Sequence, residues 1–386
     1  MSVGPRAALR ELLVALESGS RPKGGVKGIE SGVPSLGGEH LDGNGGFRLD
    51  RVRYVPREFA ASMRRGKIAV GDVLVVKDGA TTGKVALVRD SFPYKDAVVN
   101  EHVFLCRCDE RVDPGYVFWY LCSAKGQREI LSDFRGAAQG GISQRFSDLV
   151  QVPLRPIGEQ RRIVAEVEKQ FSRLDEAVAN LKRVKANAQR FVRATIQALT
   201  ASRSSSAKVT GTVADIAISL DNMREPVNKT ERANRVGTIP YLGANGQTGW
   251  IDEARFDEEL VLVVEDETFV GRKLPFSYYF SGKCWVNNHT HVLRARRELV
   301  LPKYLNLALS YYPFIPLTTG STGRRKLTKA ALMSAPIEAP DLATQHRIVA
   351  EVDRRLSIVR AVEIEVDANL TRASVLRQAV LTRGFT

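Results

Sequence analysis

A short glycine-rich segment is the first place in the chain where the residue types could do chemistry. Gly79, Gly83 and Lys84 superficially resemble the phosphate-binding loop of nucleotide hydrolases. Only three residues separate the two glycines, where that loop has four, and Val85 stands where it needs a serine or threonine for Mg²⁺. We therefore interpret the segment as a turn between two strands.

The other reactive side chains do not form a pattern typical of an enzyme centre. Cys106 and Cys108 are too closely spaced for a zinc site, so we expect free, buried or half-buried thiols. His289 and His291 alternate on a predicted strand with no third ligand in register, which favours packed or hydrogen-bonded imidazoles. No lysine follows an acidic residue by two positions, which argues against a metal-dependent nuclease core. We predict a binding protein without catalytic residues, metal or cofactor of its own.

The elements that would position a binding site occur twice in the chain. Residues 160–167 (QRRIVAEV) recur as 345–352 (QHRIVAEV) with seven of eight identities. An 18-residue difference in offset places a longer insertion in the first copy, after 33–37. The order of all matches predicts a tandem duplication with internal pseudo-two-fold symmetry. The upstream matches pair 33–37 with 239–243, 75–84 with 263–272, and 114–117 with 302–305.

Each copy is predicted to contain a globular part of mixed strands and helices, followed by one long helix. Apolar runs such as 73–76 and 261–264 favour strands. Apolar residues at steps of three and four, without Gly or Pro in 159–202 or 343–383, predict the long helices. The fold class is therefore α/β (α+β). The predicted boundaries are 1–153 and 201–338 for the globular domains and 154–200 and 339–386 for the helices.

The apolar stripe of each long helix needs a partner, because a lone amphipathic helix is marginally stable. The two helices are predicted to pair as an antiparallel coiled coil, since seams of this period usually mate with each other. The alternative is that each helix packs on its own globular part.

The charge balance is compatible with a polyanionic partner. The chain has 57 Lys and Arg against 43 Asp and Glu, a net charge of +14 without a polybasic tail. A basic protein with no nucleic-acid partner fits the same numbers. Four cysteines and the lack of a long apolar run predict a cytoplasmic protein without a membrane segment or signal peptide.

Three motifs resemble one known family. Residues 153–164 (PLRPIGEQRRIV), 77–84 (KDGATTGK) and 372–376 (RASVL) closely resemble segments of the specificity (S) subunits of Type I restriction–modification systems. The resemblance covers essentially the whole chain, in the order target-recognition domain, helix, target-recognition domain, helix. The duplicated set of motifs in register makes it specific.

This resemblance implies a non-catalytic DNA-binding subunit for host defence. Each target-recognition domain would bind one half of a bipartite, asymmetric site in double-stranded DNA, and the antiparallel helices would set the gap between the halves. Two methyltransferase (M) subunits, which bind S-adenosylmethionine, and the restriction (R) subunits, which use ATP and Mg²⁺, would join the assembly. The positions expected to bind these partners are Glu159, Gln160, Arg162, Glu166, Gln345, Arg347 and Glu351. Thr344 and His346 replace Glu159 and Arg161, which puts docking at that end in doubt.

Polar and basic loops supply the expected DNA contacts, because Arg and Lys bind guanine or phosphate and Asn and Gln bind adenine. Residues 320–326 are the best candidate, since folding does not readily explain three adjacent cations. For every position the alternative is a solvated surface group. The candidates are Arg21, Lys23, Lys27, Lys77, Thr82, Lys84, Gln139, Ser143, Gln144 and Arg145 in the first copy, and Asn245, Gln247, Arg272, Lys273, Ser321, Thr322, Arg324, Arg325 and Lys326 in the second.

Two other functions stay open from the sequence. One is a coiled-coil protein scaffold without sequence-specific DNA binding, in which the cationic loops would be dispensable. The other is a nucleic-acid enzyme with unrecognised chemistry, against which the missing motifs count. The sequence does not determine the target bases or the gap length.

Overall fold

The computed structural model describes residues 5–43, 45–136, 140–201, 207–267, 269–320 and 325–385. The chain divides into two compact units: unit 1 comprises residues 1–181 and 368–386, and unit 2 comprises 182–367. Each unit contains one globular head, head 1 (5–153) or head 2 (207–340), and part of both long helices. The predicted boundaries set the helices apart as separate domains, whereas here each helix is divided between the units because it packs against the heads.

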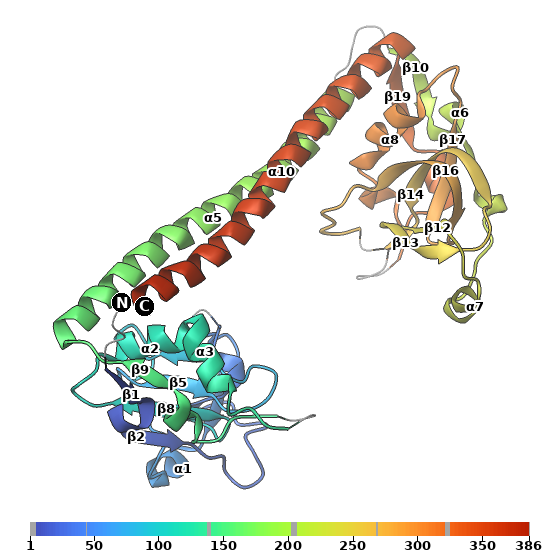
Figure 1. Cartoon of the computed structure of the whole chain (residues 1–386). Helices are drawn as coiled ribbons and strands as arrows, with labels where there is room; N and C mark the ends of the chain where they lie inside the picture. Colours follow the sequence, from blue (N-terminus) through green and yellow to red (C-terminus); the bar gives the residue numbers. More distant parts are fainter. Residues whose placement is uncertain are drawn as a thin grey trace. The chain divides into compact units, whose positions relative to one another are not determined.

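Head 1 contains a four-stranded antiparallel sheet in the order β2-β8-β5-β6 and a three-stranded sheet in the order β4-β3-β7 (Figure 1). In the smaller sheet β3 runs parallel to β7. The elements are β1 (Arg6–Ala8), η1 (Leu9–Leu12), β2 (Leu13–Ser18), β3 (Val33–Leu36), η2 (Gly38–His40), β4 (Arg53–Val55), α1 (Arg57–Ser62), β5 (Val73–Val76), β6 (Val85–Leu87), β7 (Val98–Val99), β8 (Val103–Cys108), α2 (Pro114–Cys122), α3 (Ala124–Leu131), α4 (Phe146–Leu149) and β9 (Gln151–Pro153).

Head 2 joins the counterparts of these two sheets into one six-stranded sheet, in the order β11-β17-β14-β16-β12-β13. The long strand β16 pairs with both β14 and β12, as β6 and β7 do with β5 and β3 in head 1. The elements are β10 (Ala207–Thr212), α6 (Val213–Ile216), β11 (Ala217–Ser219), η3 (Asp221–Met223), α7 (Lys229–Asn234), β12 (Ile239–Gly243), β13 (Gly246–Ile251), β14 (Phe256–Val264), β15 (Asp266–Glu267), β16 (Ser277–Val286), β17 (Thr290–Ala295), α8 (Pro302–Ser310), η4 (Ile315–Leu317), β18 (Arg325–Lys326), α9 (Lys329–Met333) and β19 (Pro336–Pro340).

The central strand of each head is buried on both faces, which explains its uninterrupted apolar sequence. In β5, Val73 and Val75 pack with α2, whereas Leu74 and Val76 belong to a second core on the opposite face. Residues 260–263 of β14 alternate between two cores in the same way. Each sheet is therefore sandwiched between apolar layers, and polar function is left to the loops at its ends.

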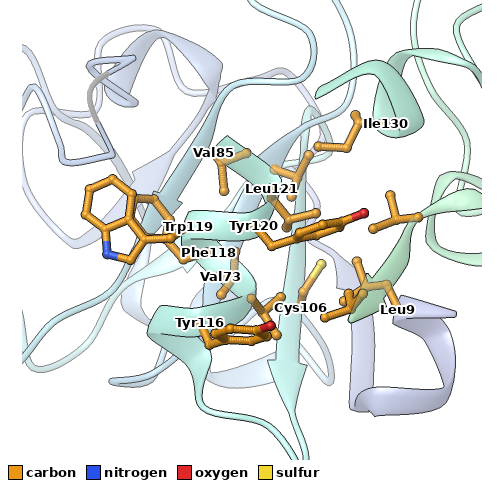
Figure 2. Close-up of a cluster of buried hydrophobic side chains, with 14 of the residues drawn as sticks. Leu9, Val73, Val85, Cys106, Tyr116, Phe118, Trp119, Tyr120, Leu121 and Ile130 are labelled. Atoms are coloured by element: carbon orange, nitrogen blue, oxygen red, sulfur yellow. The ribbon is translucent and has the colours of Figure 1, made fainter. Parts of the chain in front are cut away.

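Helix α2 fills the larger core of head 1. Pro114 occupies its first turn, and the side chain of Asp113 accepts the amide of Tyr116 (3.1 Å) as the cap. Figure 2 shows Tyr116, Phe118 and Tyr120 among the buried side chains of this core. Helix α8 of head 2 corresponds to α2, and both helices begin at a proline.

The two long helices are α5 (Ile157–Ala201) and α10 (Leu342–Phe385). In unit 1 the guanidinium of Arg377 pairs with the carboxylate of Asp175, and in unit 2 Lys185 Nζ lies 2.6 Å from Asp367 Oδ1. A step of ten residues forward on α5 matches ten residues back on α10, so the helices pair antiparallel, as predicted. Within the described ranges, no helix has the apolar run that crossing a membrane requires.

The long helices also pack on the heads, so both predicted arrangements contribute. In unit 1, the ring of Phe385 of α10 packs at a tilt against that of Tyr116 with centroids 5.0 Å apart, and Phe171 of α5 meets Trp119 edge-on at 4.8 Å. In unit 2, Val352 of α10 and Ile196 of α5 pack with Leu307 of α8. The helices are thus stabilised from two sides.

Not every apolar residue at the predicted steps of three and four is buried between the two helices. Val184 and Phe191 of α5 are 44% and 50% exposed, and Val362 and Leu376 of α10 also face solvent. The apolar stripe is wider than one antiparallel partner can cover, and the heads cover it only near the helix ends. An apolar strip on the helices therefore remains exposed.

A buried glutamine ties each head to the start of its long helix. Gln160 is fully buried; its Oε1 accepts the amide of Asp113 (2.8 Å), and its Nε2 donates to the carbonyls of Arg111 (3.1 Å) and Arg155 (2.8 Å). Gln345, also fully buried, accepts from the amide of Leu301 (2.8 Å) and donates to the carbonyls of two residues in head 2, at 2.9 and 2.8 Å. We call these two side chains the glutamine clamps. The expectation that Gln160 and Gln345 bind a partner is wrong, because both are buried and fully engaged within the chain.

Substitution of a clamp should destabilise only its own unit. Gln160→Met should lower the free energy of unfolding of unit 1 by about 3 kcal/mol, since methionine fills the space but leaves a buried amide and two carbonyls unpaired. Gln345→Met should do the same to unit 2. Hydrogen exchange followed peptide by peptide would assign each loss to its unit.

The control for both variants is Gln170→Met, on the less buried face of α5, where the amide only reaches Glu166. Its effect should stay below about 0.5 kcal/mol. Unfolding of the two clamp variants at the wild-type free energy would contradict this assignment.

Candidate nucleic-acid interface

Three segments meet in head 1, where β5 ends, and two of them carry predicted DNA-binding residues. The loop 77–84 and the segment 140–145 before α4 carry these residues, and the third segment is the turn 100–102 before β8. The amide of Lys77 donates to the carbonyl of His102 (2.8 Å), and the amide of Ile142 donates to the carbonyl of Lys77 (2.8 Å). The backbone thus joins segments separated by more than twenty residues.

Head 2 joins the corresponding segments in the same way. The amide of Glu265 donates to the carbonyl of His289 (3.1 Å), and the amide of Leu327 donates to the carbonyl of Glu265 (2.7 Å). The duplication therefore extends to the loop backbone as well as to the core.

A hydrogen-bonded histidine lies at the centre of each cluster. In head 1 the side chain of Asn100 accepts the amide of His102 (2.9 Å), and Asp78 Oδ1 lies 2.6 Å from His102 Nδ1. In head 2, Asn287 accepts the amide of His289 (3.0 Å), and Asp266 Oδ1 lies 2.5 Å from His289 Nδ1. The expectation that His289 forms hydrogen bonds is confirmed. In each head the Asp–His pair stabilises the turn.

The cysteines lie away from these clusters and are free thiols, as predicted. Cys106 and Cys284 are buried in the sheets. Burial, reinforced by the carboxylate of Asp109, raises the pKa of Cys108 to about 12. A thiol with such a pKa stays protonated at neutral pH and is a poor nucleophile.

The candidates of head 1 divide into free and engaged side chains. Lys23, Lys27, Gln144 and Arg145 are exposed. The other described candidates use their side chains within the fold; Gln139 lies outside the described residues. Arg21 pairs with Glu101 and approaches His102 Nε2 (2.9 Å), Lys77 Nζ lies 5.8 Å from the ring centre of Phe104, Thr82 donates to the carbonyl of Gly79 (2.7 Å), Lys84 packs along Gly43, and Ser143 donates to Asp133 (2.7 Å).

In head 2, Gln247 and Lys273 are exposed. Asn245 is also exposed and accepts a hydrogen bond from Arg272 (2.8 Å), which joins the β12–β13 turn to the loop before β16. The candidates Ser321, Thr322 and Arg324 lie outside the described residues.

The expectation that folding does not explain the cations of 320–326 is wrong for two of them. Arg325 donates to the hydroxyl of Thr318 (2.7 Å) and to its carbonyl (3.1 Å). Lys326 Nζ lies 3.0 Å from Glu265 Oε1. Sequence inspection missed these contacts because both partners lie outside the loop itself.

A buried charged network supports this loop in head 2. His291 Nδ1 lies 2.6 Å from Asp221 Oδ2, and its Nε2 lies 2.8 Å from the carbonyl oxygen of Leu327. Glu265 forms ion pairs with Arg224, whose Nη1 lies 2.6 Å from Glu265 Oε2, and with Lys326. Burial alone would raise the pKa of Asp221 and of Glu265. The pKa of Asp221 is nevertheless lowered, mainly by the hydrogen bond from His291. The pKa of Glu265 is lowered in the same way, mainly by the hydrogen bond from Arg224. The carboxylates are therefore charged at neutral pH and fix the base of the loop.

The two heads place different side chains on this shared backbone. The repeat aligns Lys77 with Glu265, Phe104 with His291, and Gly141 with Lys326. Head 1 thus has a cation beside an aromatic ring where head 2 has the charged network. Sequence reasoning missed the network because its members are dispersed between positions 221 and 326 and no short motif marks them.

The helix candidates, apart from the clamps, lie on accessible surface. Arg162 is exposed, and Arg347 donates to the hydroxyl of Thr344 (3.1 Å). Glu159 accepts from Arg155 (2.6 Å). Hydrogen bonds from two arginines on the next turn, Arg354 and Arg355, lower the pKa of Glu351 to about 2. Asp341 caps the amide of Thr344 (3.0 Å), so the start of α10 has its own cap where α5 has the Arg155–Glu159 pair.

An open groove of about 590 Å³ lies between α5 and α10 in unit 1. Glu166, which accepts from Gln170 (2.7 Å), lies on its edge with Arg383, and Ile163 and Leu376 contribute apolar surface. The groove therefore combines apolar and charged groups beside one predicted partner-binding residue.

Comparison with protein families gives a match in the second half of the chain. Residues 208–365 match the family described as the Type I restriction modification DNA specificity domain. A putative type I restriction enzyme specificity subunit of Haemophilus influenzae is 34% identical over 139 residues, which cover 36% of this chain and 35% of that protein. The aligned part thus spans about a third of that relative. The StySPI specificity subunit of Salmonella potsdam is 22% identical over 89% of this chain and 79% of its own length.

Solved structures share the fold over the whole chain. One belongs to a study of complex assembly and conformational transition of the type I R-M system; it covers 100% of this chain and 99% of its own, with a TM-score of 0.72 and 20% identity. The HsdS subunit from Thermoanaerobacter tengcongensis covers 98% and 96%, with a TM-score of 0.57 and 18% identity.

The two histidines of head 2 should differ sharply when substituted. His291→Phe installs the residue that head 1 has at this place, but it removes the 2.6 Å contact of Asp221 with a buried imidazole and leaves this carboxylate the amide of Val292 and the more distant Arg224 (3.5 Å). We expect the free energy of unfolding of unit 2 to fall by about 3 kcal/mol. His289→Phe breaks a half-exposed pair and should cost about 1 kcal/mol or less. Chemical denaturation of the full chain measures both, and equal losses would refute the structural role of the network.

Proposed function

Because the chain belongs to the family of Type I restriction–modification specificity subunits, we propose that it is the DNA specificity subunit of such a complex. Each head binds one half of a bipartite, asymmetric site in double-stranded DNA. The observation that carries this proposal is the duplicated loop cluster, in which one backbone arrangement presents different side chains in the two heads. Two binding modules for different base sequences need this combination of shared frame and variable surface.

The exposed polar side chains suit recognition of base edges. Gln247 and Asn245 of head 2 match adenine, which amide side chains bind through paired hydrogen bonds. Arg145 and Gln144 lie side by side in head 1 and match guanine and adenine. Exposed lysines such as Lys273 would contact phosphates, which adds affinity without sequence preference.

The helices would assemble the complex. The exposed apolar strip that includes Val184 and Phe191 supports docking of other subunits, since isolated proteins seldom expose such a surface without use. We assign this role to two M subunits, with R subunits joining them. Assembly with other subunits also agrees with the related structure from a type I complex.

Catalysis would reside in those partners rather than in this chain. The M subunits would bind S-adenosylmethionine and extrude the target adenine, because methylation requires access to a base outside the stack. The R subunits would use ATP and Mg²⁺. The chain itself would select the site and, in the cytoplasm, hold the partners on it.

Methylation sequencing of a host that expresses the chain with its neighbouring M subunit tests this function. The proposal predicts a split adenine-methylation motif with a fixed gap that is absent with the M subunit alone. A confirmed complex without a new motif would favour the protein-scaffold alternative.

Paired variants should then assign each half of the motif to one head. Gln144→Ala with Arg145→Ala should relax base preference in one half, and Asn245→Ala with Gln247→Ala in the other, because each lost base contact reduces discrimination by about 1–3 kcal/mol. The same sequencing measures both, and each double variant serves as the control for the other. Two unchanged motifs, or changes in the same half, would contradict the assignment.

A further inference from the structure

We propose that residues 56–72 of head 1, between β4 and β5, bind the phosphodiester backbone of the duplex DNA that flanks the half-site bound by this head. We call this segment the basic insert. The inference rests on the proposed function and extends it to a surface without a counterpart in head 2.

The insert contributes part of the extra length of the first copy, and the connection between β3 and β4 contributes the rest. Residues 56–72 connect β4 to β5, whereas in head 2 only residues 252–255 connect the corresponding strands β13 and β14. The added segment folds as α1 and a following loop, and it buries Ala60 and Met63 in a small core with Val55. It is therefore an ordered part of head 1, and its presence gives the two heads unequal surfaces.

The insert presents exposed cations without a carboxylate partner, although Lys67 Nζ donates to the carbonyl of Ala61 (3.3 Å). Arg57, Arg64, Arg65 and Lys67 are exposed, against two acidic residues in the segment. Among the described residues, no carboxylate lies within ion-pair distance of these four side chains. Neighbouring arginines are paired: Arg53 lies 3.3 Å from Glu39, and Arg107 lies 2.8 Å from Asp72.

A tight backbone contact holds the chain at Gly66, next to Arg64 and Arg65. The amide of Gly66 donates to Glu17 Oε2 (2.7 Å), and its carbonyl accepts the amide of Val99 (2.9 Å). Gly66 has a φ of +80°, and a Cβ on it would lie 2.8 Å from the Cα of Gly19. Only glycine fits this position, so the pair Arg64–Arg65 is held directly against the segment that follows β2.

This anchor places the insert next to the candidate DNA interface. The amide of Gly19 donates to the carbonyl of Asn100 (3.2 Å), which begins the turn 100–102. Arg21, two residues after Gly19, pairs with Glu101 of the same turn. DNA bound at the loop cluster of head 1 would therefore continue toward Arg64 and Arg65.

A cavity in the insert adds a second place for an anionic group. It has a volume of about 290 Å³ and lies between α1 and β7. Arg57, Lys67 and Lys95 line it, with Asp96 as the carboxylate among the lining residues. Cations at several points along one surface match the regular charges of a DNA strand, and they carry no base preference.

The experiment uses the purified complex of the full chain with its M subunit. Binding is measured by fluorescence anisotropy on duplexes that contain the methylated site and have either long or short flanks beside the head 1 half. The test variant is Arg64→Gln with Arg65→Gln. The matched control is Lys125→Gln with Arg128→Gln, which removes two exposed cations from α3 of the same head.

The test variant should bind the long-flank duplex about tenfold more weakly near 150 mM salt, and its slope of log Kd against log salt should fall by about two. The preference of the wild type for the long flank should be clearly reduced. The control should match the wild type in all three measurements. The methylation motif should stay the same in both variants, because phosphates carry no sequence information.

Two results would contradict the proposed role of the basic insert in DNA binding. The first is a test variant with wild-type affinity, salt slope and flank preference. The second is unchanged DNA binding with loss of a partner subunit on purification, which would make the insert a protein-docking surface. A wild-type complex that yields no split motif would instead reject the proposed function, so the two failures are distinguishable. Equal melting temperatures of the variants exclude misfolding as the cause of a loss.

Discussion

The glutamine clamps are the contacts on which the rest of the arrangement depends. Gln160 and Gln345 each use one side-chain amide to join the end of a head, the approach to a helix and the helix itself. Because both are fully buried, loss of either would leave several backbone groups without partners. A binding head can transmit its position along a helix only when this junction is rigid.

The sheets allow the two heads to diverge without loss of the fold. Strands β5 and β14 are buried on both faces, so the apolar layers maintain the frame while the loops at the strand ends are free to vary. Head 2 uses this freedom for a charged network around Glu265 and His291, and head 1 uses it for the basic insert. The charged network lies on the backbone contacts between three loop segments that both heads share, whereas the basic insert is anchored separately through Gly66.

Features that repeat or follow a period were predictable from the sequence; features that depend on distant partners were not. The duplication, the two long helices and their antiparallel pairing follow from spacing alone. The burial of Gln160 and the engagement of Arg325 by Thr318 do not, because each depends on residues that only the fold brings near. The recurrence of residues 160–167 as 345–352 shows that both copies need this sequence. It does not distinguish a surface that docks a partner from a contact inside the chain. The basic insert was visible only as extra length.

Exchange of a whole head tests most directly the claim that each head selects its own half-site through an equivalent junction. Leu9 and Val213 make the same backbone hydrogen bond at the start of the two heads, so residues 209–340 can be replaced by a second copy of 5–155. Methylation sequencing of a host with this chain and the M subunit should give a palindromic motif in which both halves equal the one bound by head 1. An unchanged asymmetric motif would contradict the account.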